Sequence, residues 1–202
     1  MTNTEESPDP RPSLFHAIEK AGDVLNQVGP EHLAMESPCA DYDVEALGRH
    51  IVLVSVRLNQ IGRGVSWADL PNDLAVTPED YVTTYRKHSK DLVETWSDDD
   101  VYVSTRELPW GNVSGSEVLW PYVAEFVTHG WDLAVVIGTD LEVDDEVAFG
   151  AFQAASHIPD DVRTGPDAPF GPVVEVDAGA DLLTQLAGRM GRDVHRWLVP
   201  RA

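Results

Sequence analysis

The stretch AEFVTHGWDLAVVIG, residues 124–138, combines an apolar body with two polar side chains that are one helical turn apart. Its composition is typical of a buried helix, yet Glu125 and His129 are separated by four positions. Residues four apart lie on the same face of a helix, so this pair is expected to project inward side by side. A core helix with a carboxylate and an imidazole on one face needs something to pair with them or bind them.

The boundaries of this helix are visible in the sequence. The SGSE segment at residues 114–117 has the pattern of a capping box, and Gly138 is a typical helix stop. Pro121 is expected either to kink the helix or to mark its true start, because a proline inside a helix removes one backbone hydrogen bond.

Three more long helices are predicted upstream from apolar residues at helical spacing, with starts near Ser13, Asp43 and Thr77. Shorter helices are predicted at 144–158 and 180–191. Two fragments, VYVST and VVEVD, have the composition of short extended segments, which is too little for a sheet-based fold. The expected fold is therefore all-α, a helical bundle with long crossover loops and short C-terminal helices.

The composition indicates one globular domain. The chain has 202 residues, of which 43% are hydrophobic and 24% charged, as in ordinary globular proteins. Residues 1–12 are acidic and rich in proline and lack the apolar segment of a secretory signal, so a disordered lead-in is expected before a single domain at 13–202. Cys39 is the only cysteine and cannot form an internal disulfide, which makes the cytoplasm the simplest location.

The charge of the chain bears on its partners. Asp and Glu number 35 against 14 Lys and Arg, which gives a formal net charge of −21. Such a chain repels the phosphates of nucleic acids and of anionic membrane surfaces. No run of about 18 apolar residues is present to span a bilayer. Neither nucleic acid nor a membrane is expected as a partner.

A second polar side chain enters the predicted core from another helix. His50 lies on the apolar stripe of the helix that follows Asp43, and Arg57 lies two turns further along the same side. One metal ion would satisfy His50, Glu125 and His129 together, whereas unpaired burial costs roughly 2–7 kcal/mol for each group. Two imidazoles and a carboxylate are the ligands of open catalytic zinc sites and of non-haem iron sites. The alternative is a hydrogen-bonded core histidine and a Glu–His contact without metal.

Two stretches of the chain resemble the signatures of a known family. SPCADYDVEALGRHIV at 37–52 and EFVTHGWDLAVVIG at 125–138 are similar to those of DinB-like proteins related to mycothiol-dependent maleylpyruvate isomerase. The segment 170–193 resembles the C-terminal part of a single-domain, actinobacterial-type subfamily of that group. The likeness is specific at HGWDL and looser at ADYDV, where the family more often has tryptophan in place of Tyr42.

The resemblance implies a DinB-like four-helix bundle in which His50, Glu125 and His129 hold a divalent ion, usually zinc. It also points to mycothiol as a cosubstrate. A metal with an open position can stabilise a thiolate, which then adds to an electrophilic substrate and gives either isomerisation or S-transfer.

Other residues are weighed for supporting roles. A carboxylated substrate needs a cation, for which Arg57 is the first candidate and Arg86 the second. Asp132 is a candidate acceptor for a metal-bound imidazole, or else it caps local structure or faces solvent. The loops at 62–76 and 97–115 are expected to form the mouth of the site, with Trp67, Trp110 and Asn112 as candidate lining residues, although such aromatics are as often lids on the core.

Two non-enzymatic hypotheses stand beside the enzyme. One is a metal-containing protein that binds or senses a small molecule without turnover, since no general acid or base is evident beyond the ligands. The other is a purely structural helical homodimer with a buried polar cluster. A fourth protein ligand that closes the metal site would argue against catalysis.

Overall fold

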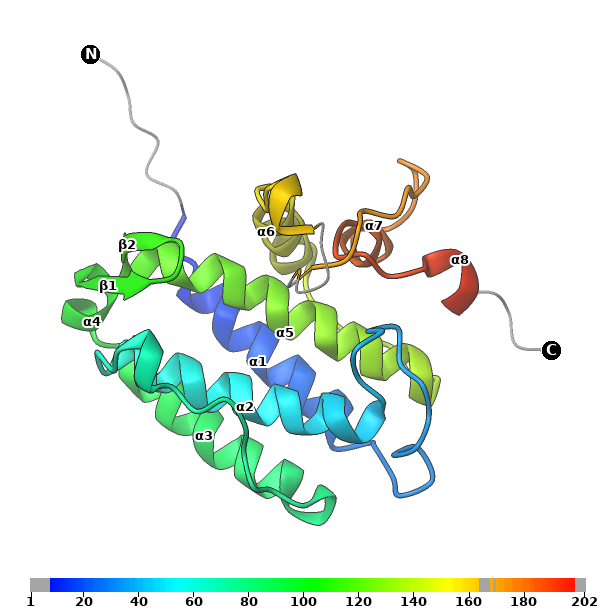
Figure 1. Cartoon of the computed structure of the whole chain (residues 1–202), viewed down its shortest axis with the longest axis horizontal. Coiled ribbons are helices and arrows are strands. Elements are labelled where there is room, and N and C mark those ends of the chain that lie inside the picture. Colours follow the sequence, from blue (N-terminus) through cyan, green and yellow to red (C-terminus); the bar gives the residue numbers. More distant parts are fainter. Residues whose placement is uncertain (1–7, 164–167, 169, 199–202) are drawn as a thin grey trace.

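The structure, a computed structural model, describes residues 8–163, 168 and 170–198 and is mostly helical (Figure 1). The helices of this part of the chain are α1 (Arg11–Leu25), α2 (Val44–Gly62), α3 (Tyr81–Trp96), α4 (Asp99–Val103), α5 (Gly115–Ile137), α6 (Asp145–Ser156), α7 (Leu182–Arg189) and α8 (Val194–Trp197). Short 3-10 turns lie at Trp67–Asp69, Pro78–Asp80 and Asp160–Arg163. Strands β1 (Thr105–Leu108) and β2 (Gly111–Ser114) form an antiparallel hairpin in which Thr105 pairs with Ser114. The expectation of an all-α chain is confirmed at this level.

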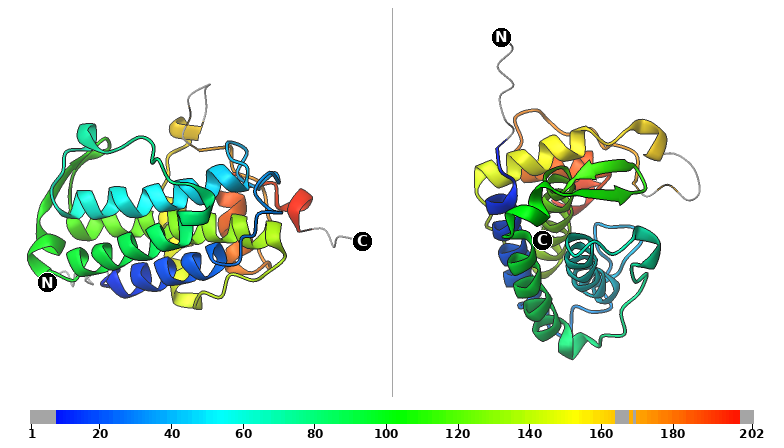
Figure 2. Two further views of the ribbon diagram at one scale, coloured as in Figure 1. Left: turned by 90° about the horizontal axis from the view of Figure 1, so that it is seen from below. Right: turned by 90° about the vertical axis from the view of Figure 1, so that its left-hand side faces the viewer.

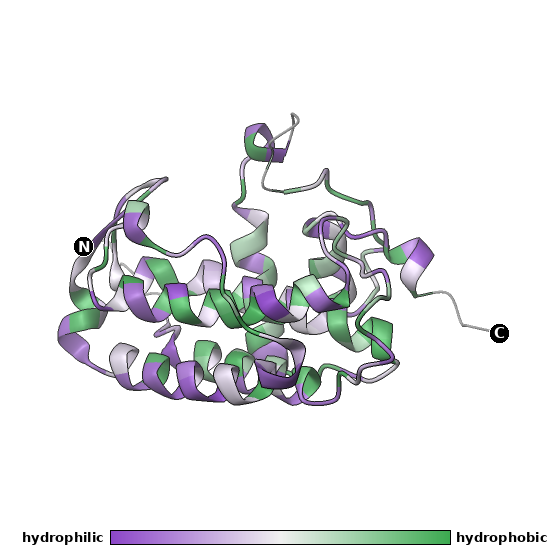
Figure 3. Ribbon diagram, turned by 60° about the horizontal axis from the view of Figure 1, so that its bottom comes forward, coloured by the Kyte–Doolittle hydropathy of each residue, from purple (hydrophilic) through white to green (hydrophobic). Residues whose placement is uncertain are grey.

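The four longest helices pack side by side (Figures 1 and 2). Helices α1 and α2 each contact both α3 and α5, so the four apolar stripes meet in one core. Figure 3 shows hydrophilic and hydrophobic bands alternating along these helices, as expected for helices with one buried face. Helix α6 packs on α1 and α5, and α7 packs on α5 and α6.

The helix boundaries follow the capping residues of the sequence. The Asp43 side chain accepts a hydrogen bond from the backbone of Ala46 and so caps α2. Ser114 and Glu117 form the expected capping box of α5, and Gly138 ends that helix in the left-handed conformation with φ of 72°. The sequence signals for these two helices are therefore confirmed.

Some boundaries differ from the expectations. Helix α1 begins at Arg11, two residues before Ser13, and the Asp9 carboxylate accepts the backbone N–H of Arg11 at 2.9 Å. Residues 1–7 of the expected lead-in lie outside the described residues. Pro121 lies within α5 and does not mark its start.

Of the two possible extended segments, VYVST is mostly helical and VVEVD lies in no strand. Most of VYVST belongs to α4, which starts where the Asp98 carboxylate accepts the backbone N–H of Asp100 at 2.8 Å. VVEVD forms no strand in the described structure, and the hairpin lies at 105–114 instead.

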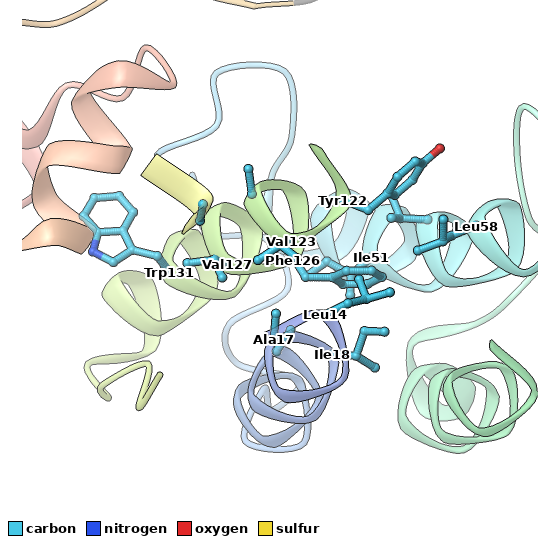
Figure 4. Close-up of a cluster of buried hydrophobic side chains, with 14 of the residues drawn as sticks. Leu14, Ala17, Ile18, Ile51, Leu58, Tyr122, Val123, Phe126, Val127 and Trp131 are labelled. Atoms are coloured by element: carbon cyan, nitrogen blue, oxygen red, sulfur yellow. The ribbon is translucent and has the colours of Figure 1, made fainter. Parts of the chain in front are cut away.

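The core beneath the site is built mainly from α1, α2 and α5. Figure 4 shows side chains from these helices meeting, among them Leu14, Ile51 and Phe126, each at most 1% exposed. A Cβ atom on Gly130 would lie 3.1 Å from Leu141 Cδ1, so a larger residue here would press on the Leu141 side chain. Among the described residues, none of the helices has both the length and the apolarity needed to cross a membrane.

Candidate metal centre

Helices α2 and α5 bring the three predicted ligands together. The Glu125 Oε1 atom lies 3.0 Å from His50 Nε2 and 3.4 Å from His129 Nε2. One donor atom from each of the three residues lies within 4.8 Å of the others, and the two imidazole centroids are 4.8 Å apart. Ligand bonds of about 2 Å place tetrahedral donor atoms roughly 3 to 3.5 Å apart, so the two contacts of Glu125 already have the spacing of a metal site.

The centre is buried on one side and open on the other. The His129 side chain is 8% exposed, whereas those of His50 and Glu125 are 19% and 27% exposed. Three protein ligands leave at least one coordination position free, and the exposed side is where a water or a ligand can enter.

The closed side contains a buried ionic chain. Asp132 is fully buried, and its Oδ2 atom lies 3.0 Å from His129 Nδ1. Arg192 holds both oxygens of this carboxylate, with Nη2 at 2.7 Å from Oδ2 and Nε at 3.1 Å from Oδ1. Metal-ligating histidines commonly donate their second ring N–H to a carboxylate, and Asp132 has the position for this role.

Arg192 was not identified from the sequence. It lies beyond α7, and its own Nη1 donates to the carbonyl of Met190 at 2.8 Å. A weak signal was available, since Arg192 stands between the apolar residues Met190 and Val194, both buried in the structure. The contact spans 60 positions along the chain, so no local pattern assigns its partner.

The electrostatics of the metal-free centre follow from this chain of charges. Burial alone would raise the pKa of Glu125, but His129 and His50 beside it hold that pKa well below its usual range. Burial alone would lower the pKa of His129, but the charge of Glu125 and the hydrogen bond with Asp132 raise it to about 9. Burial opposes ionisation of Asp132, yet Arg192 and His129 lower its pKa. Without metal, His129 is therefore protonated on both ring nitrogens at neutral pH and carries a positive charge.

The donor set fits a divalent cation. A metal ion would take the place of the proton on His129 Nε2. The proton on Nδ1 would remain bonded to Asp132, and Glu125 would become a ligand of the ion. A second group of metal-binding residue types, Cys39 with His129 and Asp132, shares only His129 with the first. It fits a cation less well, because Arg192 already occupies both oxygens of Asp132 and burial raises the pKa of the Cys39 thiol to about 11.

Aromatic and cationic side chains lie beside His50 and further along α2. The Tyr42 ring stacks on His50, with centroids 4.8 Å apart and planes inclined by 28°. The Arg57 guanidinium lies 4.6 Å from the centroid of the Trp67 ring, and Trp67 contacts Trp110 edge to face at 5.7 Å. The two expected mouth loops thus meet through their tryptophans.

The structure does not bring the other predicted residues to the centre. Arg86 is exposed on α3 and donates to Asn26 Oδ1 at 3.1 Å, at the end of α1. Asn112 is exposed on β2 and makes no described side-chain contact with the three ligands.

Comparison with known proteins gives relatives along nearly the whole chain. The chain is similar to the uncharacterized protein MT0763 of Mycobacterium tuberculosis strain CDC 1551 / Oshkosh and to the uncharacterized protein Rv0738 of strain H37Rv. Each alignment has 26% identity over 186 residues and covers 92% of this chain and 99% of the relative. No family model matches the sequence. No solved structure matches it either. Both relatives are uncharacterized, so the similarity brings no activity to this chain.

Proposed function

We propose that the chain is a DinB-like four-helix-bundle protein that binds a divalent metal through His50, Glu125 and His129 and uses it in thiol chemistry. The observation that carries the metal site is the position of Glu125 Oε1 between the Nε2 atoms of two histidines from different helices. Zinc is the ion we propose, because two imidazoles and one carboxylate in a compact arrangement are a common set for catalytic zinc.

The residues of the chain prepare this site in two ways. His129 donates its Nδ1–H to Asp132, which keeps Nε2 free for the ion and fixes the plane of the ring. Arg192 holds Asp132 in place and balances its charge inside the protein. When bound, the ion supplies a Lewis acid that lowers the pKa of a water or thiol in its open position.

The thiol part of the proposal rests on the resemblance of the HGWDL and ADYDV stretches to mycothiol-dependent proteins. We therefore propose a small-molecule thiol, with mycothiol as the first candidate, and an electrophilic second substrate. The reaction class is S-transfer or isomerisation in the cytoplasm. The partly exposed side of the centre, beside His50 and Glu125, is the place where both molecules would meet.

Two measurements test this proposal in sequence. Protein purified without a metal-affinity tag is analysed for metal, and we expect about one divalent ion per chain. The native ion is then replaced with cobalt and mycothiol is added, for which a sulfur-to-cobalt charge-transfer band is expected. A metal-free protein that also fails to take up added zinc would refute the site. A cobalt-loaded protein without the band at saturating mycothiol would favour the metal-containing binding or sensing protein over the enzyme.

A further inference from the structure

Arg57 differs from the other arginines that the structure describes. Each of the others donates a hydrogen bond or forms an ion pair with a described residue: Arg11, Arg49, Arg63, Arg86, Arg106, Arg163, Arg189, Arg192 and Arg196. Within the described residues, Arg57 has no hydrogen bond or ion pair: its guanidinium lies over the Trp67 ring, and its buried Nε atom has no partner. An unpaired cation in a chain with a formal charge of −21 needs an explanation, because carboxylates are abundant.

The stacking leaves the guanidinium ready to bind an anion. Its central carbon lies over the Trp67 ring, 4.6 Å from the centroid, which is within the range of a cation–π contact. The N–H donors of a guanidinium lie in the plane of the group, in a fork that matches a carboxylate. Arg57 is half-buried, so the fork is partly shielded from water while part of the residue still reaches solvent. The buried Nε atom is out of reach of a ligand, so a bound carboxylate would be held by the two terminal nitrogens of the fork, which are not buried.

Arg57 also lies close to the metal centre. It follows His50 by seven positions on α2, which is two turns along the same side. The charges of Glu125 and Arg57 both act on two tyrosines near the centre. Burial raises the pKa of Tyr42 and of Tyr122, Glu125 raises both pKa values further, and Arg57 lowers them. Figure 4 shows the Tyr122 hydroxyl directed away from the apolar cluster, on the side of α2.

We propose that Arg57 binds the carboxylate of a ligand whose other end occupies the open position of the metal centre. The substrate class is thus an organic acid, or a thiol that carries a carboxylate, long enough to reach from the centre to Arg57. This inference rests on the proposed metal site and adds to it a preference for anionic ligands. The selection for charge comes from Arg57, since the rest of the chain is strongly acidic and repels anions.

The test uses cobalt-loaded full-length protein and pairs of thiols that differ only in charge. The probes are 3-mercaptopropionate, 4-mercaptobutyrate and 6-mercaptohexanoate, each compared with its carboxamide, and the charge-transfer band reports binding. We expect at least one carboxylate to bind about tenfold or more tightly than its amide, as a charge-assisted hydrogen bond provides. Arg57→Met should abolish this preference without removing the band, and Arg57→Lys should retain part of it. The matched control Arg86→Met should leave it unchanged.

Two results would overturn the proposal: equal binding of acid and amide at every chain length, or a preference that survives in Arg57→Met. A second measurement does not depend on thiol binding. The NMR resonance of the Arg57 Nε–H group, assigned by its loss in the folded Arg57→Lys variant, is followed while zinc-loaded protein is titrated with butyrate and then with butyramide. We expect a saturable shift with butyrate alone, and no shift would refute the anion site. If no thiol gives a band but butyrate shifts Arg57, the thiol chemistry fails and the anion site stands.

Discussion

The two histidines of the candidate metal centre have opposite surroundings. His129 is buried, and the Asp132 carboxylate against its Nδ1 atom is itself held by both ends of the Arg192 fork. His50 is partly exposed and is flanked by the Tyr42 ring, which supports it by stacking. Arg57, further along α2, has no ionic partner within the described residues. One side of the centre is thus complete without a ligand, and the other is not.

This difference indicates that the closed side holds the metal and the open side binds exchangeable ligands. A fully paired buried network holds a ligand in a fixed position, because any movement would leave a charge unpaired at low dielectric. An open side with a stacked aromatic ring and an unpaired cation has room for exchangeable molecules. We therefore expect substitutions on the closed side to affect the metal and substitutions on the open side to affect what binds to it.

The largest effect is expected for the buried ligand itself. His129→Ala should lower zinc affinity by more than about a hundredfold, since loss of a residue that only orients a ligand already costs about 10- to 100-fold. His88→Ala is the matched control, because His88 lies on α3 and belongs to neither metal-binding group. Metal content after dialysis against a competing chelator measures both. Equal retention of zinc by the two variants would remove the metal assignment.

The next effect concerns the partners of His129. Arg192→Met should lower zinc affinity about 10- to 100-fold and destabilise the fold by about 3 to 5 kcal/mol, because it leaves the Asp132 carboxylate buried without its cation. Asp132→Asn/Arg192→Met should restore much of the stability but not the zinc affinity. Urea unfolding and zinc titration distinguish the two. If the double variant is as unstable as the sum of the single ones, the two residues are not coupled as described.

The closed side also predicts a pH dependence. Since the pKa of His129 is raised to about 9 in the metal-free protein, the proton must leave before zinc can bind. Zinc affinity should therefore rise about tenfold per pH unit below pH ~8 and level off above pH ~9. Calorimetry at pH 7 in buffers of different ionisation enthalpy should show release of about one proton for each zinc bound. An affinity that is flat between pH 6 and pH 8 would contradict the proton on His129.

The smallest effect on the metal is expected on the open side. Tyr42→Phe keeps the ring that stacks on His50 and should change zinc affinity by less than about threefold, while Tyr42→Ala should cost less than about tenfold, in the range of one aromatic contact. Zinc titration of both variants provides the comparison with Arg192→Met. If Tyr42→Phe lowered zinc affinity as much as Arg192→Met, the open side would hold the metal as strongly as the closed side, and the proposed difference between the two sides would be wrong.

The extent to which the sequence predicted this site depended on how local the signal was. Glu125 and His129 share a helical face, and the cap at Asp43 places His50 on an inward stripe, so their convergence was predictable from periodicity. Asp132 was foreseen as one of several alternatives, since it follows His129 within a turn. The pairing of Asp132 with Arg192 was not predictable, because it depends on how the chain after α7 returns to α5.

The same reasoning explains where the structure differs from the sequence expectations. VYVST has β-branched and aromatic residues, but the acidic run before it caps and starts α4, so the capping residue outweighed the intrinsic preference. The charge of Arg86 and its place on a helix make it a candidate in the sequence, and in the structure its side chain is exposed on α3 and donates to Asn26. Which face of an amphipathic helix meets which partner is decided by packing, and a single sequence does not contain it.

X-ray absorption at the zinc edge of the loaded, thiol-free protein tests the central claim most directly. His50, Glu125 and His129 predict a shell of nitrogen and oxygen atoms at about 2.0 to 2.2 Å, with the outer-shell scattering of two imidazoles and no sulfur. A zinc–sulfur distance of about 2.3 Å would instead place the ion on the Cys39 side of His129 and contradict the proposed centre.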